Sequence, residues 1–300
     1  MPAAPLADWD LPVVPGLGPD EDPGEEARRL IRDGGGPREE VMQALADWVR
    51  ESKLPEMRDG ALVKFAHSCD YDLERAKKCV KSFHSARSQA ADLFSEWDTE
   101  LPNIRSILNV VRIAVMPRKT PDNYRVIVDS LQTSDTTNYV FLDVCRVTLM
   151  VLESIFLSEP TVDGIIVVHD VGNATISHFT KIGWSCWTTA RKFSSYTQDA
   201  LPLIRHSAHL VNCSGFIDKA LRLVSHLGSK EDWEKLSVHR GDDVTGLHQR
   251  VPPECLPSDL GGSLPSLAEL HGIQQNKGFA LRADNSEGGT TLKICVRRVI

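Results

Sequence analysis

The residues best suited to chemistry in this sequence are cysteines, serines and histidines that lie beside short apolar runs. Asn212-Cys213-Ser214-Gly215 follows one such run, where a hydrolase nucleophile would be expected. A serine hydrolase of that kind needs Gly-x-Ser-x-Gly on a sharp strand-to-helix turn, and a glycine run that binds the oxyanion. The sequence lacks the first glycine and the glycine run. An esterase that uses Ser214 or Cys213 is therefore only a third hypothesis.

The histidines also fail to form a catalytic or metal-binding set. His206 and His209 are three residues apart on an expected strand, so their side chains point to opposite faces and cannot share a metal. His169 and Asp170 are neighbours on another expected strand and diverge for the same reason. Cys145 has no basic partner or helix N-terminus that would activate its thiol. The sequence therefore predicts no catalytic residue, no metal site and no cofactor.

Composition narrows the class of protein further. The chain has 300 residues and a net charge of −7, which argues against nucleic acid as the main partner because phosphate binding needs a dense basic surface. Seven cysteines without a Cys-x-x-Cys pair are typical of free thiols in a reducing compartment. The sequence shows neither a signal peptide nor an apolar run long enough to span a bilayer. We therefore expect a cytoplasmic protein.

Four regions follow from the pattern along the chain. Residues 1–37 are rich in proline, glycine and acidic side chains, and we expect a flexible leader there. Residues 38–97 have apolar side chains at three- and four-residue steps, which predicts a helical module in which Asp72 caps the third helix. Residues 98–271 form the main domain. Residues 272–300 are a polar tail to which we assign no role.

The main domain alternates apolar runs with helical patterns. Strands are expected at residues 124–128, 164–170, 208–212 and 236–239, and helices at 141–156, 175–196 and 216–227. The second strand is apolar on both faces, as in a sheet that is covered on both sides. Such alternation predicts an α/β layer with parallel strand pairing.

Six segments, in order along the chain, resemble the CRAL-TRIO lipid-binding family, and most closely its α-tocopherol-transfer-protein-like branch. They are Arg58–Phe65 with Tyr71–Ala76, Arg146–Leu149, Asp163–Gly172 with the following His178, Gln198–Pro202, His209–Asn212 and Leu256–Gly262. The last segment has Asp259-Leu260 where the family usually has Glu-Tyr, which should not alter the fold. The resemblance implies a helical N-terminal module and then a mixed sheet. Helices would cover one face of that sheet, and an apolar pocket under a gating helix would lie on the other.

The resemblance also implies a non-enzymatic function. The protein would bind a hydrophobic small molecule or a lipid, of tocopherol, retinoid or phosphoinositide type, and carry it between membranes through transient contact with their surfaces. Thr148 would be the best hydrogen-bond partner for a ligand hydroxyl. Carried over position by position, the pocket wall would contain Cys145, Thr148, Leu152, Ile165, Val167, Leu203, Ala208 and Leu210.

The sequence allows two interpretations of the expected gating helix. The residues assigned to the gating helix are Phe216, Ile217, Leu221, Val224 and Leu227, and their apolar pattern fits a buried core helix as well as a lid. The resemblance favours the lid.

In close relatives, basic residues around the gating helix bind a phosphoinositide headgroup. The matching residues here are Ile204, His206, Glu231 and Lys235, of which only Lys235 keeps a firm charge. We therefore do not expect release by that set, and instead assign possible headgroup contacts to Arg205, Lys230, Lys235 and Arg240. The alternative function is a regulatory or protein-interaction module that keeps the fold but has lost cargo exchange.

Overall fold

The structure is a computed structural model of the chain. It describes residues 36–55, 57, 59–159, 161–182, 186–225, 229–241, 244–277, 281–284 and 291–294. Residues 1–35 of the expected leader lie outside the described residues. Residues 36 and 37, which the sequence assigned to the leader, instead begin the first described helix.

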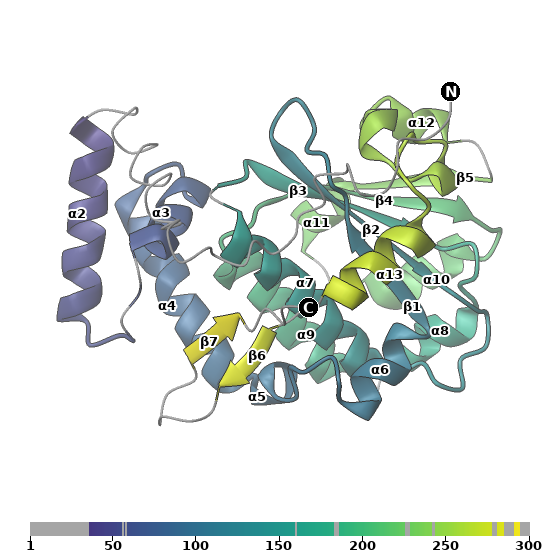
Figure 1. Ribbon diagram of the computed structural model, residues 1–300, viewed down its shortest axis with the longest axis horizontal. Coiled ribbons are helices and arrows are strands. Elements are labelled where there is room, and N and C mark those ends of the chain that lie inside the picture. The colour runs from purple at the N-terminus through teal and green to yellow at the C-terminus, as the bar shows by residue number, and fades with distance from the viewer. Residues whose placement is uncertain are drawn as a thin grey trace.

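A helical module forms the N-terminal part of the described chain, as predicted. Its helices are α2 (Gly36–Glu51), α3 (Asp59–Ser68), α4 (Leu73–Gln89) and α5 (Ala91–Phe94). The Asp72 side chain accepts hydrogen bonds from the backbone N–H groups of Glu74 and Arg75, both at 3.0 Å, which confirms the predicted cap of α4. Figure 1 shows α2, α3 and α4 side by side at one end of the molecule.

A five-stranded mixed sheet forms the centre of the main domain. Its strands are β1 (Val111–Val115), β2 (Tyr124–Leu131), β3 (Gly164–Asp170), β4 (Arg205–Cys213) and β5 (Leu236–Arg240), in the order β1-β2-β3-β4-β5. β1 is antiparallel to β2, and the other three pairings are parallel. All four expected strands are present. The sequence analysis missed β1, because only Asn109 and Val110 separate it from the preceding helix and no glycine or proline marks its start.

Helices connect the strands. They are α6 (Pro102–Leu108), α7 (Phe141–Ser158), α8 (Ile176–Ile182), α9 (Trp187–Ser195), a π-helical turn (Tyr196–Ala200), α10 (Ile217–Val224) and α11 (Lys230–Glu234). The expectation of one helix over residues 175–196 is wrong, because α8 and α9 are separate. The intervening sequence contains Gly183, which disfavours a continuous helix.

The C-terminal segment covers one face of the sheet. It contains α12 (Thr245–His248), 3-10 turns at Pro253–Cys255 and Ser258–Leu260, and α13 (Leu267–Lys277), which Figure 1 shows lying across the sheet. Its leucines pack against the sheet residues of one buried cluster, namely Val126, Val128, Ile166, Val168 and Val211. A separate antiparallel ribbon, β6 (Leu281–Asp284) and β7 (Thr291–Ile294), follows α13.

Helix α13 also protects the edge strand β1. The side chain of Gln274 accepts a hydrogen bond from the Val115 N–H at 3.0 Å and donates one to the Val115 carbonyl at 2.6 Å. The Nδ1 atom of His271 lies 3.2 Å from the Ile113 nitrogen and 2.9 Å from the Ile113 carbonyl oxygen, so it either accepts from the N–H or donates to the carbonyl, depending on the tautomer. These contacts satisfy backbone groups that an uncovered edge strand would leave unpaired. The helix therefore continues the fold past the boundary expected between residues 271 and 272.

Candidate functional site

A cavity of about 970 Å³ lies over the face of the sheet that the C-terminal segment leaves free. Side chains alternate between the two faces of a strand, so every second residue of β3 borders the cavity. Ile165, Val167 and His169 line it, whereas Ile166 and Val168 pack against the C-terminal leucines. In the same way Ile127 and Asp129 on β2, and Ala208 and Leu210 on β4, line the cavity.

Helices form the remaining walls of the cavity. Helix α7 contributes a long apolar stripe, and residues of α8, α9 and α10 complete the enclosure. The sequence analysis expected helices on one face of the sheet and a pocket under a gating helix on the other; in the structure α7, α8, α9 and α10 all border the pocket. Helix α7 is apolar on more than one side, so it can border the cavity and also pack against the N-terminal module.

The structure brings all eight residues of the expected pocket wall to this one cavity. They are Cys145, Thr148 and Leu152 on α7, Ile165 and Val167 on β3, Leu203 before β4, and Ala208 and Leu210 on β4. The Thr148 hydroxyl donates a hydrogen bond to the carbonyl of Val144 in its own helix, at 2.9 Å. It therefore keeps only its acceptor capacity for another molecule. Contact of these residues with a ligand stays a prediction.

The expected gating helix has two environments along its length. Ile217 and Ala220 are fully buried, and Ile217 packs with Leu210 and Cys213 beside the sheet. Leu221 and Val224 line the cavity further along α10. Phe216 does not line it and instead meets Phe179 edge-to-face at 6.1 Å. Leu227, the last residue assigned to this helix, lies outside the described residues.

The four basic residues assigned to a headgroup do not gather into one site. Arg205 and Lys235 line the mouth of the cavity, whereas Lys230 and Arg240 do not. Each of the four pairs with a carboxylate: Arg205 with Asp232, Lys235 with Glu231 at 2.6 Å, Lys230 with Glu234 at 3.6 Å and Arg240 with Asp218 at 2.8 Å. Sequence reasoning did not place Arg75 and Lys78 of α4 at this mouth, although their helix had a visibly basic face.

One end of the cavity is polar. The Nδ1 atom of His169 lies 2.7 Å from a carboxylate oxygen of Asp129 on the neighbouring strand. Burial lowers the pKa of His169 and the Asp129 charge raises it, with a raised pKa as the net effect. Sequence reasoning considered only Asp170 as a partner for His169. The signal that it missed is that residues 129 and 169 occupy matching positions near the ends of two parallel strands.

Comparison with known proteins places this architecture in a family. The CRAL/TRIO domain family matches residues 110–262, just over half of the chain, and these residues include the whole five-stranded sheet. The chain belongs to the CRAL/TRIO family. A second family, the Pinta-like UBA domain, matches residues 37–104. The resemblance drawn from the sequence motifs is therefore confirmed.

Two named proteins and one solved structure are similar to this CRAL/TRIO protein. Alpha-tocopherol transfer protein-like of Mus musculus is 24% identical over 274 residues, which are 88% of this chain and 78% of that protein. Clavesin-2 of Rattus norvegicus is 23% identical over 208 residues, which are 69% of this chain and 62% of that protein. The solved structure of Sfh5 covers 84% of this chain and 92% of its own, at 14% identity and a TM-score of 0.48.

Of the groups considered for hydrolytic chemistry, Cys213 and Ser214 lie apart from the cavity. Burial raises the pKa of the Cys213 thiol, and neither Cys213 nor the exposed Ser214 lines the cavity. Burial also raises the pKa of Cys145, which does line it. Such thiols stay protonated and are poor nucleophiles. Among the described residues, no cluster of three or more His, Cys, Asp or Glu side chains could hold a metal ion, and no helix could span a membrane.

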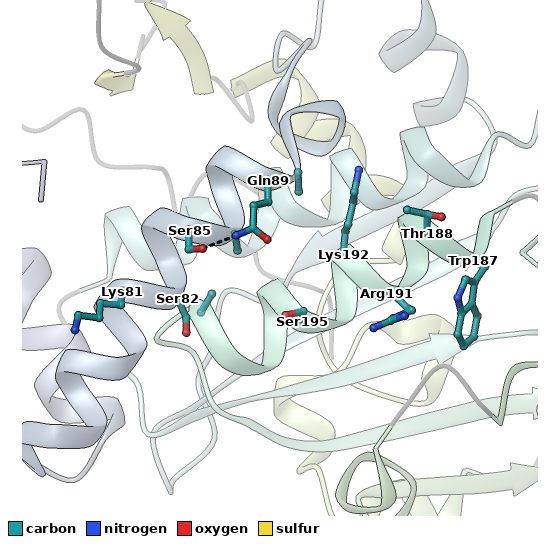
Figure 2. Close-up of a pocket in the computed structure, with 12 residues that line it drawn as sticks. Lys81, Ser82, Ser85, Gln89, Trp187, Thr188, Arg191, Lys192 and Ser195 are labelled. Carbon is teal, nitrogen blue, oxygen red and sulfur yellow. Dashed lines mark hydrogen bonds between the residues drawn. The ribbon is translucent and has the colours of Figure 1, made fainter.

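A second hollow, of about 560 Å³, lies between α4 and α9 of the CRAL/TRIO protein (Figure 2). Its wall is mostly hydroxyl, amide and basic side chains, and Ser85 accepts a hydrogen bond from Gln89 at 2.7 Å. The basic groups are already engaged: Lys192 pairs with Asp92 at 2.8 Å, and Arg191 lies over the Trp187 ring. This hollow therefore has neither the apolar wall nor the free charges of a binding site.

Proposed function

We propose that this CRAL/TRIO protein binds one hydrophobic small molecule or lipid in the cavity on the sheet and carries it between membranes. The observation that carries the proposal is the cavity itself, which gathers the eight residues that the family resemblance assigns to a pocket wall. The name of the mouse relative, alpha-tocopherol transfer protein-like, supports the same class of cargo.

Desolvation would provide most of the affinity. Burial of apolar surface contributes about 25 cal/mol per Å², so a ligand that buries about 300 Å² gains about 7.5 kcal/mol before the cost of association is subtracted. The walls suit this role because β2, β3, β4 and α7 present mainly aliphatic side chains to the cavity. A hydrophobic cargo would fit this wall better than a polar metabolite.

Membrane contact during exchange is part of the proposal. Ile176 on α8, Ile204 before β4 and Leu223 on α10 are 41%, 42% and 45% exposed, and α8 and α10 pack together beside the cavity. These side chains would insert between lipid headgroups as α10 moves away. Phosphoinositide could assist by competing for Arg205 and Lys235, although the carboxylates of Asp232 and Glu231 would have to leave first.

We propose a carrier rather than an enzyme. The support is the protonated state of the buried thiols and the position of Ser214 outside the cavity. Unchanged hydrolysis of generic ester substrates by Ser214→Ala and Cys213→Ala variants would agree with this assignment. Loss of a measurable esterase activity in either variant would contradict it.

The alternative function is a regulatory or protein-interaction module on the same fold. The pairing of all four candidate headgroup residues with carboxylates favours it, because such pairs would oppose opening at an anionic membrane. Two measurements separate the functions. Native mass spectrometry after exposure to tocopherol, retinoids and phosphatidylinositol should show one bound molecule per chain if the protein is a binder. Movement of a labelled lipid between vesicles should then occur for a carrier and not for the alternative.

A further inference from the structure

Two cysteines meet where the N-terminal module borders the mouth of the cavity. Cys69 directly follows α3, in the turn that leads to α4. Cys79 lies on the face of α4 that carries the buried residues Ala76 and Val80. The Cys79 thiol is hydrogen-bonded to the Cys69 sulfur. Two free thiols from adjoining elements are therefore in direct contact.

The backbone of the turn holds Cys69 beside α4. Asp70 and Tyr71 have φ angles of 54° and 59°, in the left-handed region, which makes the turn tight. The Tyr71 N–H donates to the Ala66 carbonyl at 2.8 Å, and the Asp72 N–H donates to the Cys69 carbonyl at 2.9 Å. These hydrogen bonds join the end of α3 to the cap of α4, so the contact between the two sulfurs is part of the fold.

Both thiols can be reached through the cavity. Cys69 is only 7% exposed and Cys79 is half-buried, yet both line the cavity, beside Arg75 and Lys78 at its mouth. A cavity of about 970 Å³ admits a molecule as small as hydrogen peroxide. Burial in the module therefore does not close this pair to a small reagent.

The two thiols differ in acidity. The hydrogen bond from Cys79 lowers the pKa of Cys69 against the effect of burial, and the Ser68 hydroxyl and the Arg75 charge lower it further. The same hydrogen bond, followed by burial, raises the pKa of Cys79. The Cys79 thiol also contacts the Ala200 carbonyl, its second acceptor, at 3.5 Å. Cys69 is therefore the thiolate of the pair, and the thiolate is the reactive form.

We propose that Cys69 and Cys79 form a redox modification site, at which a hydroperoxide closes a reversible disulfide. With hydrogen peroxide, the Cys69 thiolate attacks one oxygen and becomes a sulfenic acid, and the hydroxide that leaves takes up a proton to give water. The Cys79 sulfur then attacks the Cys69 sulfur, and the sulfenic hydroxyl leaves with the Cys79 proton as a second water. The two thiols give up two electrons, which reduce the peroxide. This modification does not depend on the proposed binding function.

The test is peroxide treatment of the reduced full-length protein, followed by alkylation with iodoacetamide and peptide mass spectrometry. We expect one peptide pair cross-linked through Cys69 and Cys79, with the loss of two alkylation sites that dithiothreitol restores. Oxidation of this pair should be at least about tenfold faster than that of Cys145, since one unit of pKa is a tenfold difference in thiolate fraction.

Single variants separate the roles of the two cysteines. In Cys79→Ser the sulfenic acid at Cys69 should persist and react with dimedone, because no second thiol is in contact with it. In Cys69→Ser, Cys79 should form no dimedone adduct. Cys145→Ser is the matched control, because Cys145 also lines the cavity but burial, followed by Cys186, raises its pKa. The yield of the cross-link should be unchanged in that variant.

Thermal unfolding establishes that each variant is folded. The proposal would be overturned if Cys69 and Cys79 of the wild type stayed open to alkylation after a peroxide treatment that oxidises free cysteine. A disulfide from either residue to a different cysteine, or a dimedone adduct at Cys79 in place of Cys69, would also overturn it.

Discussion

The two faces of strand β3 differ in what covers them, although they belong to the same seven residues. On one face, Ile166 and Val168 are at most 2% exposed and pack against the leucines of the C-terminal segment. On the other face, Val167 and His169 border the cavity. Close packing stabilises a fold, while uncovered apolar surface is available to a ligand. The difference implies that the first face supports stability and the second supports binding.

The helices that border the cavity must be stabilised by contacts on their other sides, because the cavity separates them from the sheet. The Glu153 carboxylate of α7 is fully buried and accepts hydrogen bonds from Arg87 of α4 and from the Tyr196 hydroxyl. Arg87→Met should lower the free energy of unfolding by about 3 to 5 kcal/mol, because it leaves a buried carboxylate without its counter-charge. Urea denaturation measures the change. The Arg87→Met, Glu153→Gln double variant should lose less free energy of unfolding, because it leaves no buried charge. A loss as large as that of Arg87→Met alone would contradict this explanation.

The face packed by the C-terminal segment should be the next most sensitive region. Leu270 of α13 is fully buried in its leucine cluster. Leu270→Ala should cost about 2 to 5 kcal/mol of unfolding free energy, from lost apolar contact and the space left behind. Chemical denaturation of the variant provides the measurement. A cost below about 1 kcal/mol would show that the packed face does not stabilise the sheet in the way described.

Neighbouring valines offer the sharpest form of the comparison. Val168→Phe enlarges a side chain that is fully enclosed, and should destabilise the fold by about 1 to 3 kcal/mol. Val167→Phe enlarges a side chain that borders the cavity, and should change stability by less than about 0.5 kcal/mol while weakening lipophile binding. Thermal unfolding and binding are measured on both variants. Equal changes in stability and in lipophile binding for the two variants would mean that the two faces of β3 are equivalent, contrary to the structure.

Histidines on the two faces should respond to pH with opposite signs. His209 on the packed face contacts His239 at 3.1 Å, and burial, followed by the charge of His239, lowers its pKa to about 4. The unfolded chain takes up this proton near pH 6.5, so stability should fall as the pH is lowered from 6.5 to 4, by about 2 to 3 kcal/mol.

His169 contributes in the other direction, because its raised pKa gives stability that is present below pH 6.5 and is lost as the pH rises through the folded-state pKa. Unfolding temperatures measured from below pH 4 to above pH 7 contain both effects, that of His209 below pH 6.5 and that of His169 above it. The fall below pH 6.5 should be shallower in His209→Asn. An equally steep fall in that variant would assign the effect to other groups.

The sequence predicted the packed and apolar parts of this molecule well. Period-two and helical patterns identified four of the five strands, because β2, β3 and β4 contain buried β-branched or aliphatic runs and the partly buried β5 alternates apolar and polar residues. β1 was missed because only Asn109 and Val110 separate it from α6 and no glycine or proline marks its start, and the residues that cover its edge, Gln274 and His271, are about 160 positions away. Local pattern has no access to such a partner.

The polar part of the cavity was harder to predict for the same reason. Asp129 meets His169 only through the parallel register of β2 and β3, and the unsatisfied N–H of His178 becomes visible only when its surroundings are known. For the candidate headgroup residues, the sequence showed the charges but not all of their partners. Their charges were evident in the sequence, but the carboxylates that neutralise them come from α10 and α11. Lys230 with Glu234 and Lys235 with Glu231 are i,i+4 pairs that the spacing already contains, whereas Arg205 with Asp232 and Arg240 with Asp218 depend on tertiary contacts that spacing does not fix.

The most direct test of the central claim is the stoichiometry of lipophile bound to the full-length protein, determined by native mass spectrometry beside Val167→Phe. The account predicts one octadecan-1-ol molecule per wild-type chain, and substantially reduced occupancy in a Val167→Phe variant that unfolds at the wild-type temperature. A wild-type chain that stays free of every lipophile offered, or a Val167→Phe chain that binds as well as the wild type, would contradict it.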